Sequence, residues 1–162
     1  MLTKRAVTIL AVSAAAIAGG SGAASAAASS VHRSAEHFRI VSTQAGSRRL
    51  SVIASGAFTA GGYEVPRSGG GEVVLPGGTF TLRLSENSGS GSASSTCLFT
   101  QTDKGRFTIG HGTGRYTGIT GSGKVSTSSI DVTARNAAGK CIHLNSPVAY
   151  QAMTTANGTI TR

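Results

Sequence analysis

The sequence predicts an all-β protein, a closed barrel or a sandwich, and two observations favour this class. After residue 28 no apolar period of 3.6 residues persists, whereas short segments rich in Val, Ile, Phe and Thr recur between Gly, Pro and Ser turn signals. Gly accounts for 23 of the 162 residues, about twice ordinary usage. A barrel suits the small stock of apolar residues, because it removes exposed sheet edges and needs only one apolar interior.

The first 28 residues have the layout of a secretory signal peptide. Lys4 and Arg5 precede a weakly apolar run over residues 6–18, and small residues provide cleavage sites after Ala26 or Ala28. A membrane anchor is the alternative, but a spanning helix needs about 20 apolar residues. No other stretch is apolar enough to span a bilayer, so we expect a secreted, extracellular protein without a transmembrane span.

Residues 29–48 show no clean period, and we expect them to form a frayed N-terminal arm. Residues 49–162 are then a single β-barrel domain. Its cleanest alternation is at 79–85, where aromatic and aliphatic residues alternate with Thr, Arg and Ser. Further strands are expected at 50–59, 63–65, 72–75, 96–102, 106–109, 124–134 and 147–161, the last as one or two strands around Asn157-Gly158. We expect 87–95 to be a hairpin loop and 103–105 a turn.

The chain is basic, which raises the question of anionic partners. Without residues 1–28 it has 13 Lys and Arg and 6 Asp and Glu, a formal charge of +7. Such a charge favours polyanions such as nucleic acid or an anionic cell-surface polymer. The basic residues are scattered, however, and the only tight pair, Arg48-Arg49, has no aromatic neighbours that would stack on bases. We expect a solvated surface charge and no specific nucleic-acid binding.

Cys97 and Cys141 are predicted to form a disulfide, because their number is even and an exported chain meets an oxidising compartment. Metal binding is the alternative. It has little support from two thiols so far apart, without a CxxC or CxxH spacing. No cofactor motif and no metal site are expected.

The segment from Gly118 to Val125 approaches a phosphate-binding loop but departs from it at one essential position. That motif needs Ser or Thr after the Lys and a helix behind it, whereas here Val125 opens a strand-forming segment. No nucleophile, base and acid can be assembled either: there is no GxSxG motif, His111 lies in a Gly-rich turn, and no two carboxylates have a fixed spacing. We predict no catalytic residues.

The glycines of this region have a structural interpretation. Gly tolerates positive φ, bends and close backbone approach, which tightly coiled barrel strands need. The predicted structural glycine turn comprises Gly112, Gly114, Gly118, Gly121 and Gly123.

The stretch from Gly105 to Gly123 resembles the GTGxYxGxxGxG signature of the allene oxide cyclase/dirigent-like barrel superfamily. Small secreted actinobacterial proteins of that type are the closer likeness, through the segments at 97–100, 139–141 and 147–151. The resemblance covers about residues 50 to 161. It implies a closed barrel of about eight antiparallel strands, a cavity for a small apolar ligand, and a homo-oligomer (dimer or trimer). The plant relatives cyclise a fatty-acid epoxide or guide phenoxy-radical coupling, but their catalytic residues have no matched positions here.

We therefore expect a non-catalytic secreted barrel that binds a small hydrophobic ligand or a cell-surface component. One alternative is a cyclase or dirigent-like enzyme acting on a small hydrophobic substrate in the cavity. Another is a basic protein that interacts with the cell envelope. The expected cavity-lining residues are Phe58, Phe80, Phe99 and Tyr116, and the polar candidates for the cavity are Arg83, Glu86 and Tyr150.

Overall fold

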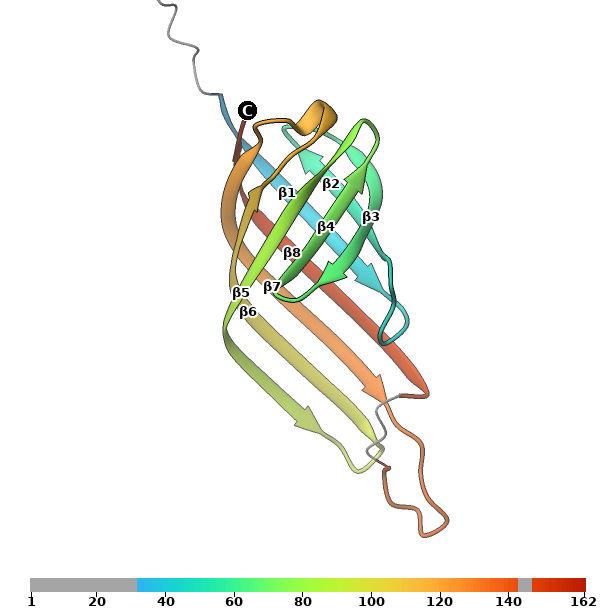
Figure 1. Cartoon of the computed structure of the whole chain (residues 1–162). Coiled ribbons are helices and arrows are strands. Elements are labelled where there is room, and N and C mark those ends of the chain that lie inside the picture. Colours follow the sequence, from blue (N-terminus) through green and yellow to red (C-terminus); the bar gives the residue numbers. More distant parts are fainter. Residues whose placement is uncertain (1–31, 143–146) are drawn as a thin grey trace, which may run out of the picture. The chain divides into compact units, whose positions relative to one another are not determined.

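The computed structural model describes residues 32–142 and 147–162, so the expected signal peptide at 1–28 lies outside the described residues. Eight antiparallel strands close into a barrel in which each strand pairs with the next and β8 pairs with β1 (Figure 1). The prediction of an all-β barrel of about eight strands is confirmed. The strands are β1 (Arg33–Ser42), β2 (Leu50–Gly56), β3 (Ala60–Arg67), β4 (Gly70–Leu75), β5 (Gly78–Ala93), β6 (Leu98–Gly110), β7 (Thr120–Val132) and β8 (Ala149–Thr161).

Alternation with a period of two decides which side chains face the lumen. In β5, Phe80 and Leu82 are fully buried, as the pattern at 79–85 predicted. In β1, Glu36 and Phe38 are buried between exposed neighbours. Each strand therefore has an inner face toward the lumen and an outer face toward solvent.

Residues 33–42 form β1 and not the arm that the sequence led us to expect. This strand pairs with β2 on one edge and β8 on the other, so the barrel begins near Arg33. The alternation of apolar and polar residues in β1 is hard to recognise in the sequence. One inward position holds a carboxylate, Glu36, and outward positions hold charged or titratable groups such as His37. Pairing on both edges stabilises the strand where local β propensity is weak.

The segment 87–95 was expected to be a hairpin loop, but β5 continues through it to Ala93. A register shift between Glu86 and Ser88 marks a bulge, after which β5 pairs with β6 along its full remaining length. Ser and Gly have low strand propensity, so composition predicted a loop. The long partner strand supplies the backbone hydrogen bonds that hold these residues extended.

Two more strands are longer than expected. β6 runs without a break through 103–105, where a turn was expected, and β8 is one strand through Asn157-Gly158. Both of these segments pair residue by residue with β7. A central strand between two partners forms even where its sequence resembles a turn.

Strands β5 to β8 extend beyond the shorter strands as a four-stranded sheet (Figure 1). β4 pairs with β5 only as far as Arg83, and β1 pairs with β8 only as far as Ala152. We call the part of this sheet past the β5 bulge the extension; it comprises 89–93, 98–103, 127–132 and 149–154. The inner face of the extension continues the inner face of the barrel.

Aromatic side chains fill the half of the lumen next to the short 3₁₀ helix η1 (Gly114–Tyr116). The rings of Phe38, Phe58, Phe80, Phe107 and Tyr116 contact one another with centroid separations of 5.2–6.4 Å. Edge-to-face and tilted pairs of this kind add to the stabilisation from burial. This half of the barrel is a packed core.

Two glycines of the Gly-rich segment are required by close backbone approach. A Cβ at Gly112 would lie 1.7 Å from the carbonyl oxygen of Tyr116, and one at Gly123 would lie 2.2 Å from that of Asn157. Gly123 also lies directly opposite Gly158 across β7 and β8. These two glycines allow the turn and the paired strands to pack closely, which is a structural role.

The predicted disulfide is confirmed. Cys97 and Cys141 are bonded, with their Cα atoms 5.3 Å apart. The bond joins the β5–β6 loop to the β7–β8 connection beside the extension. Within the described residues, no helix has the length and apolar character needed to cross a membrane.

Candidate functional site

The half of the lumen away from η1 holds a cavity of about 320 Å³. Inward-facing side chains from six strands line it, which places it inside the barrel and at the mouth that adjoins the extension. One wall is apolar and the other carries hydroxyl groups. The apolar wall includes Ile40, Leu50, Pro66 and Leu84, and the hydroxyl-bearing wall includes Ser42, Thr127, Tyr150 and Thr154.

Most of the hydroxyl-bearing wall lies on β7 and β8. The hydroxyl groups of Thr127 and Thr154 lie 2.9 Å apart and are hydrogen-bonded across the two strands. Tyr150 is half-buried, and burial together with the nearby Asp131 carboxylate raises the pKa of its hydroxyl. Tyr150 is therefore protonated at neutral pH and available as a hydrogen-bond donor toward the cavity.

The polar wall continues onto the inner face of the extension. Gln101 Nε2 donates to Asp103 Oδ2 at 2.8 Å, and Phe99, Gln101 and Asp131 border a second hollow of about 310 Å³. Asp131 lies between Phe99 and Tyr150 in the strand register. A molecule in the cavity would thus meet further hydrogen-bonding groups outside the mouth.

Glu64 is a buried carboxyl group that neighbours residues of the cavity wall without lining the cavity itself. It faces inward on β3, is 3% exposed, and lies opposite Leu50 and one inward position from Pro66. Among the described residues no side chain is hydrogen-bonded or ion-paired to it, and burial raises its pKa to about 7. The sequence did not single out Glu64; the signal that would have found it is its inward phase in a strand.

We expect Glu64 to make the stability of the barrel depend on pH. Because its folded-state pKa is raised from 4.5 to about 7, the folded state holds this proton more tightly than the unfolded chain. Its contribution is fully present below pH 4.5 and is lost as the pH rises to 7. By linkage the loss is about 3 kcal/mol.

The variant Glu64→Gln should lose about 3 kcal/mol less stability than the wild type when urea unfolding is compared at about pH 4 and about pH 8, because it lacks only the part that Glu64 contributes. The control is Glu72→Gln, a change of the same type on the outer face of the neighbouring strand β4. It should keep the pH dependence of the wild type. An equal decline in wild type and Glu64→Gln would contradict the assignment.

A second buried carboxyl group, Glu36, closes the opposite end of the barrel. Its Oε2 accepts a hydrogen bond from the Phe58 backbone N–H at 3.2 Å, which holds the β2–β3 loop over the aromatic core. Burial raises the pKa of Glu36, and backbone N–H donors, first that of Phe58, oppose the rise. Arg162 donates to the Ala57 carbonyl at 2.9 Å and lies over the Phe58 ring. These contacts cover the end of the barrel that holds the aromatic core.

The expected site residues lie in four different places. Phe58, Phe80 and Tyr116 face the lumen, but they pack on one another in the aromatic core. Phe99 lies apart from them, on the extension.

Of the polar candidates, the structure brings Tyr150 to the cavity. Arg83 is exposed on the outer face of β5, between the inward Leu82 and Leu84, so it points away from the lumen. The side chain of Glu86 lies outside the described part of the structure. His111 is exposed in the turn before η1 and does not reach the cavity.

Among residues 32–142 and 147–162, no three His, Cys, Asp or Glu side chains are grouped as metal ligands would be. No protein-family model, curated protein or solved structure matches this chain.

Proposed function

We propose that this protein binds a small amphipathic molecule in the cavity of its lumen without transforming it. The observation that carries the proposal is a cavity of about 320 Å³ with one apolar wall and one hydroxyl-bearing wall. Sites for small ligands are concave, mostly apolar, and begin at roughly 300 Å³. The apolar part of the ligand packs against Ile40, Leu50 and Leu84, and its polar end accepts a hydrogen bond from Tyr150.

Export of the protein is part of the same proposal. The leader-like residues 1–28 and the Cys97–Cys141 disulfide both fit an oxidising, extracellular compartment. Membership of the allene oxide cyclase/dirigent-like superfamily also fits an eight-stranded barrel, although the fold alone does not assign an activity. A secreted carrier or receptor for a small molecule is the function that combines these features.

A second candidate function, isomerisation or cyclisation of the bound molecule, is favoured by Glu64. A carboxyl group with a pKa of about 7 exchanges a proton readily near neutral pH, as a general acid or base must. Glu64 would need contact with the ligand to act in this way. Catalysis would appear as a product that Glu64→Gln does not form, whereas pure binding leaves the ligand chemically unchanged.

We expect the neutral fluorophore N-phenyl-1-naphthylamine to bind in the cavity with increased fluorescence. The variant Ala152→Trp places an indole ring in the cavity, because Ala152 lines it. It should weaken binding roughly tenfold or more, about 1.4 kcal/mol.

The matched control is Ala149→Trp, which adds the same ring to the outer face of the same strand. It should bind the fluorophore within about a factor of two of the wild type. Circular dichroism would verify that both variants keep the β fold. Wild-type affinity in Ala152→Trp would refute the cavity as the binding site.

A further inference from the structure

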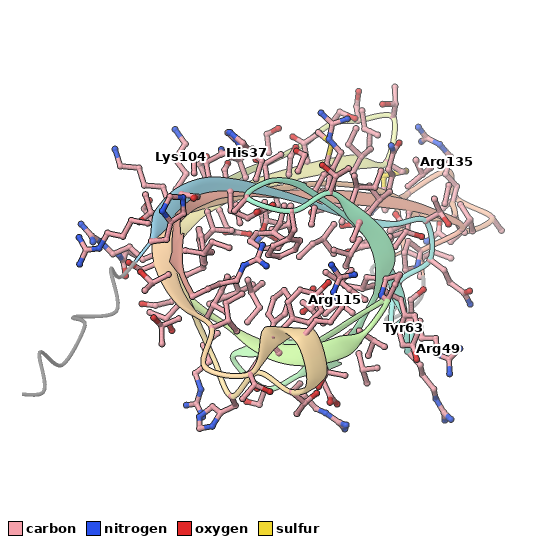
Figure 2. All side chains as sticks on the ribbon, turned by 90° about the horizontal axis from the view of Figure 1, so that it is seen from above. His37, Arg49, Tyr63, Lys104, Arg115 and Arg135 are labelled. Carbon is pink, nitrogen blue, oxygen red and sulfur yellow. A yellow bond between two sulfur atoms is a disulfide. The ribbon has the colours of Figure 1, made fainter. Side chains whose placement is uncertain are left out.

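The two signs of charge are separated between the inner and outer faces of the barrel. Of the five acidic residues whose side chains are described, four face inward: Glu36, Glu64, Asp103 and Asp131. The basic side chains lie outside, and Figure 2 shows His37 and Lys104 pointing outward from the same side of the barrel. The electrostatic potential around the outer face of the barrel is therefore more positive than the net charge alone implies.

Four of these cations occupy the joined outer faces of β6, β7, β8 and β1. Arg106 lies directly opposite Lys124 across β6 and β7, while Lys104 and Arg39 belong to the adjacent row of outward residues. Like charges directly opposite one another destabilise a sheet. No described acidic side chain points outward from these four strands, so an external anion would offset the repulsion.

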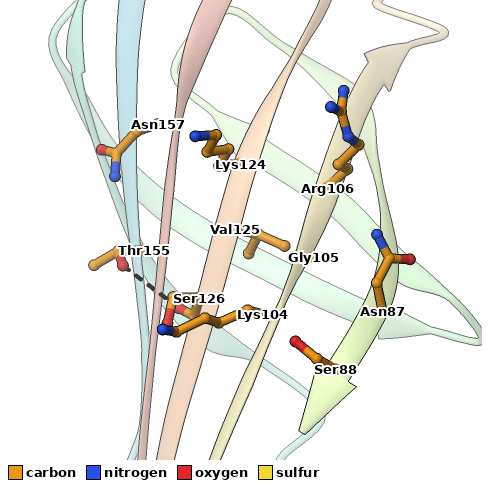
Figure 3. Close-up of a pocket in the computed structure, with 10 residues that line it drawn as sticks. All are labelled: Asn87, Ser88, Lys104, Gly105, Arg106, Lys124, Val125, Ser126, Thr155 and Asn157. Carbon is orange, nitrogen blue, oxygen red and sulfur yellow. Dashed lines mark hydrogen bonds between the residues drawn. The ribbon is translucent and has the colours of Figure 1, made fainter.

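The cations border two adjacent hollows. One hollow of about 380 Å³ is bordered by Lys104, Arg106 and Lys124 (Figure 3). A second hollow of about 380 Å³ is bordered by His37 and Arg39. Thr155 and Asn157 line both hollows, so the two adjoin at β8. We call these two hollows, with their four Lys and Arg and His37, the basic track.

We propose that the basic track binds an acidic polysaccharide. Neighbouring strands are about 4.8 Å apart, and alternate residues of a strand are about 6.7 Å apart, so the cations can contact successive anionic groups of one extended polymer. Ser88 and Ser126 lie among the cations and offer hydroxyl groups to the sugar rings. Asn157 and Thr155 lie beside them, where Asn157 Oδ1 is hydrogen-bonded to His37 Nδ1 and Thr155 donates to the Ser126 carbonyl. The track thus matches both the charges and the hydroxyl groups of such a chain.

The same face does not suit single-stranded nucleic acid. Binding of that class combines cations with aromatic side chains on which bases stack. Every Phe and Tyr of β6, β7, β8 and β1 faces inward, namely Phe38, Phe99, Phe107 and Tyr150. The exposed stack of Arg49 over Tyr63, 4.5 Å from the ring centroid, lies elsewhere on the barrel (Figure 2).

Fluorescence anisotropy with a labelled heparin fragment tests this proposal. The triple variant Lys104→Ser, Arg106→Ser, Lys124→Ser should weaken binding about tenfold or more. It should also flatten the dependence of log K on log salt, since fewer cations then displace counterions. The matched control, Arg48→Ser, Arg67→Ser, Lys140→Ser, removes three exposed cations away from the track. It should weaken binding less than about threefold.

Three results would overturn the proposal. Equal weakening by the control triple would assign the affinity to net charge. Equal or tighter binding of an oligothymidylate of matched charge would assign the track to nucleic acid. Binding of neutral dextran as tight as that of heparin would remove the role of the cations. Unfolding curves within about 0.5 kcal/mol of the wild type, as is usual for surface changes, would establish that both triples are folded.

Discussion

Phe80→Ala is expected to lower the free energy of unfolding by about 3–5 kcal/mol, the range for truncation of a buried aromatic side chain. Phe80 is fully buried and forms ring contacts with Phe38, Phe58 and Tyr116. Removing its ring leaves a void among side chains that come from separate elements, and strands hydrogen-bonded on both edges cannot close that void. The measurement is equilibrium unfolding in urea followed by circular dichroism.

The control for this prediction is Ile53→Ala. Ile53 is an apolar residue on the outer face of β2 and is 58% exposed. Its truncation should change stability by less than about 1 kcal/mol. If Phe80→Ala destabilised the protein no more than Ile53→Ala, the aromatic core would not be the packed centre of the barrel.

Replacing both cysteines by alanine is expected to lower the free energy of unfolding by about 4 kcal/mol, from the chain entropy that the disulfide removes in the unfolded state. Cys97 and Cys141 are 44 residues apart in the sequence, and the loop between them contains all of β6 and all of β7. Without the bond the unfolded chain gains entropy. The barrel keeps its β1–β8 pairing and its core.

Two comparisons support the interpretation of that result. Wild-type protein unfolded in the presence of a thiol reductant should match the double alanine variant, because both lack the same bond. Binding of N-phenyl-1-naphthylamine should be retained in both, since neither cysteine lines the cavity. If the free energy of unfolding fell by less than about 1 kcal/mol, the unfolded chain would already be so compact that the disulfide removes little of its entropy.

The parts of the fold that the sequence predicted correctly rest on local patterns. The alternation at 79–85 placed Phe80 and Leu82 in the core, and the two cysteines paired as expected. The segments missed were those stabilised by pairing. Residues 33–42 are held extended by β8, far away in the sequence, and the Ser- and Gly-rich residues 88–93 by β6, the next strand along the chain.

The candidate site was predicted less well than the fold for a related reason. Tyr150 was expected near the cavity and lies there, whereas Glu64 was not singled out and Arg83 points outward. A carboxylate in a short strand gives no sign of its own burial. Its burial depends on the other side chains of the lumen, which are brought together when β8 pairs with β1 and closes the barrel.

Composition and short-range spacing were enough to predict an all-β chain and the backbone role of its glycines, because both depend on residues and their near neighbours. The disulfide followed from there being two cysteines, which leaves one possible pairing. Closure of the barrel decided the rest. It placed an aromatic core at one end and a two-sided cavity at the other, and it turned most described carboxylates inward. It also gathered cations from β6, β7 and β1 around two adjoining hollows. The physical reason is that pairing between distant strands sets the face and the neighbours of every side chain, and no local pattern contains that information.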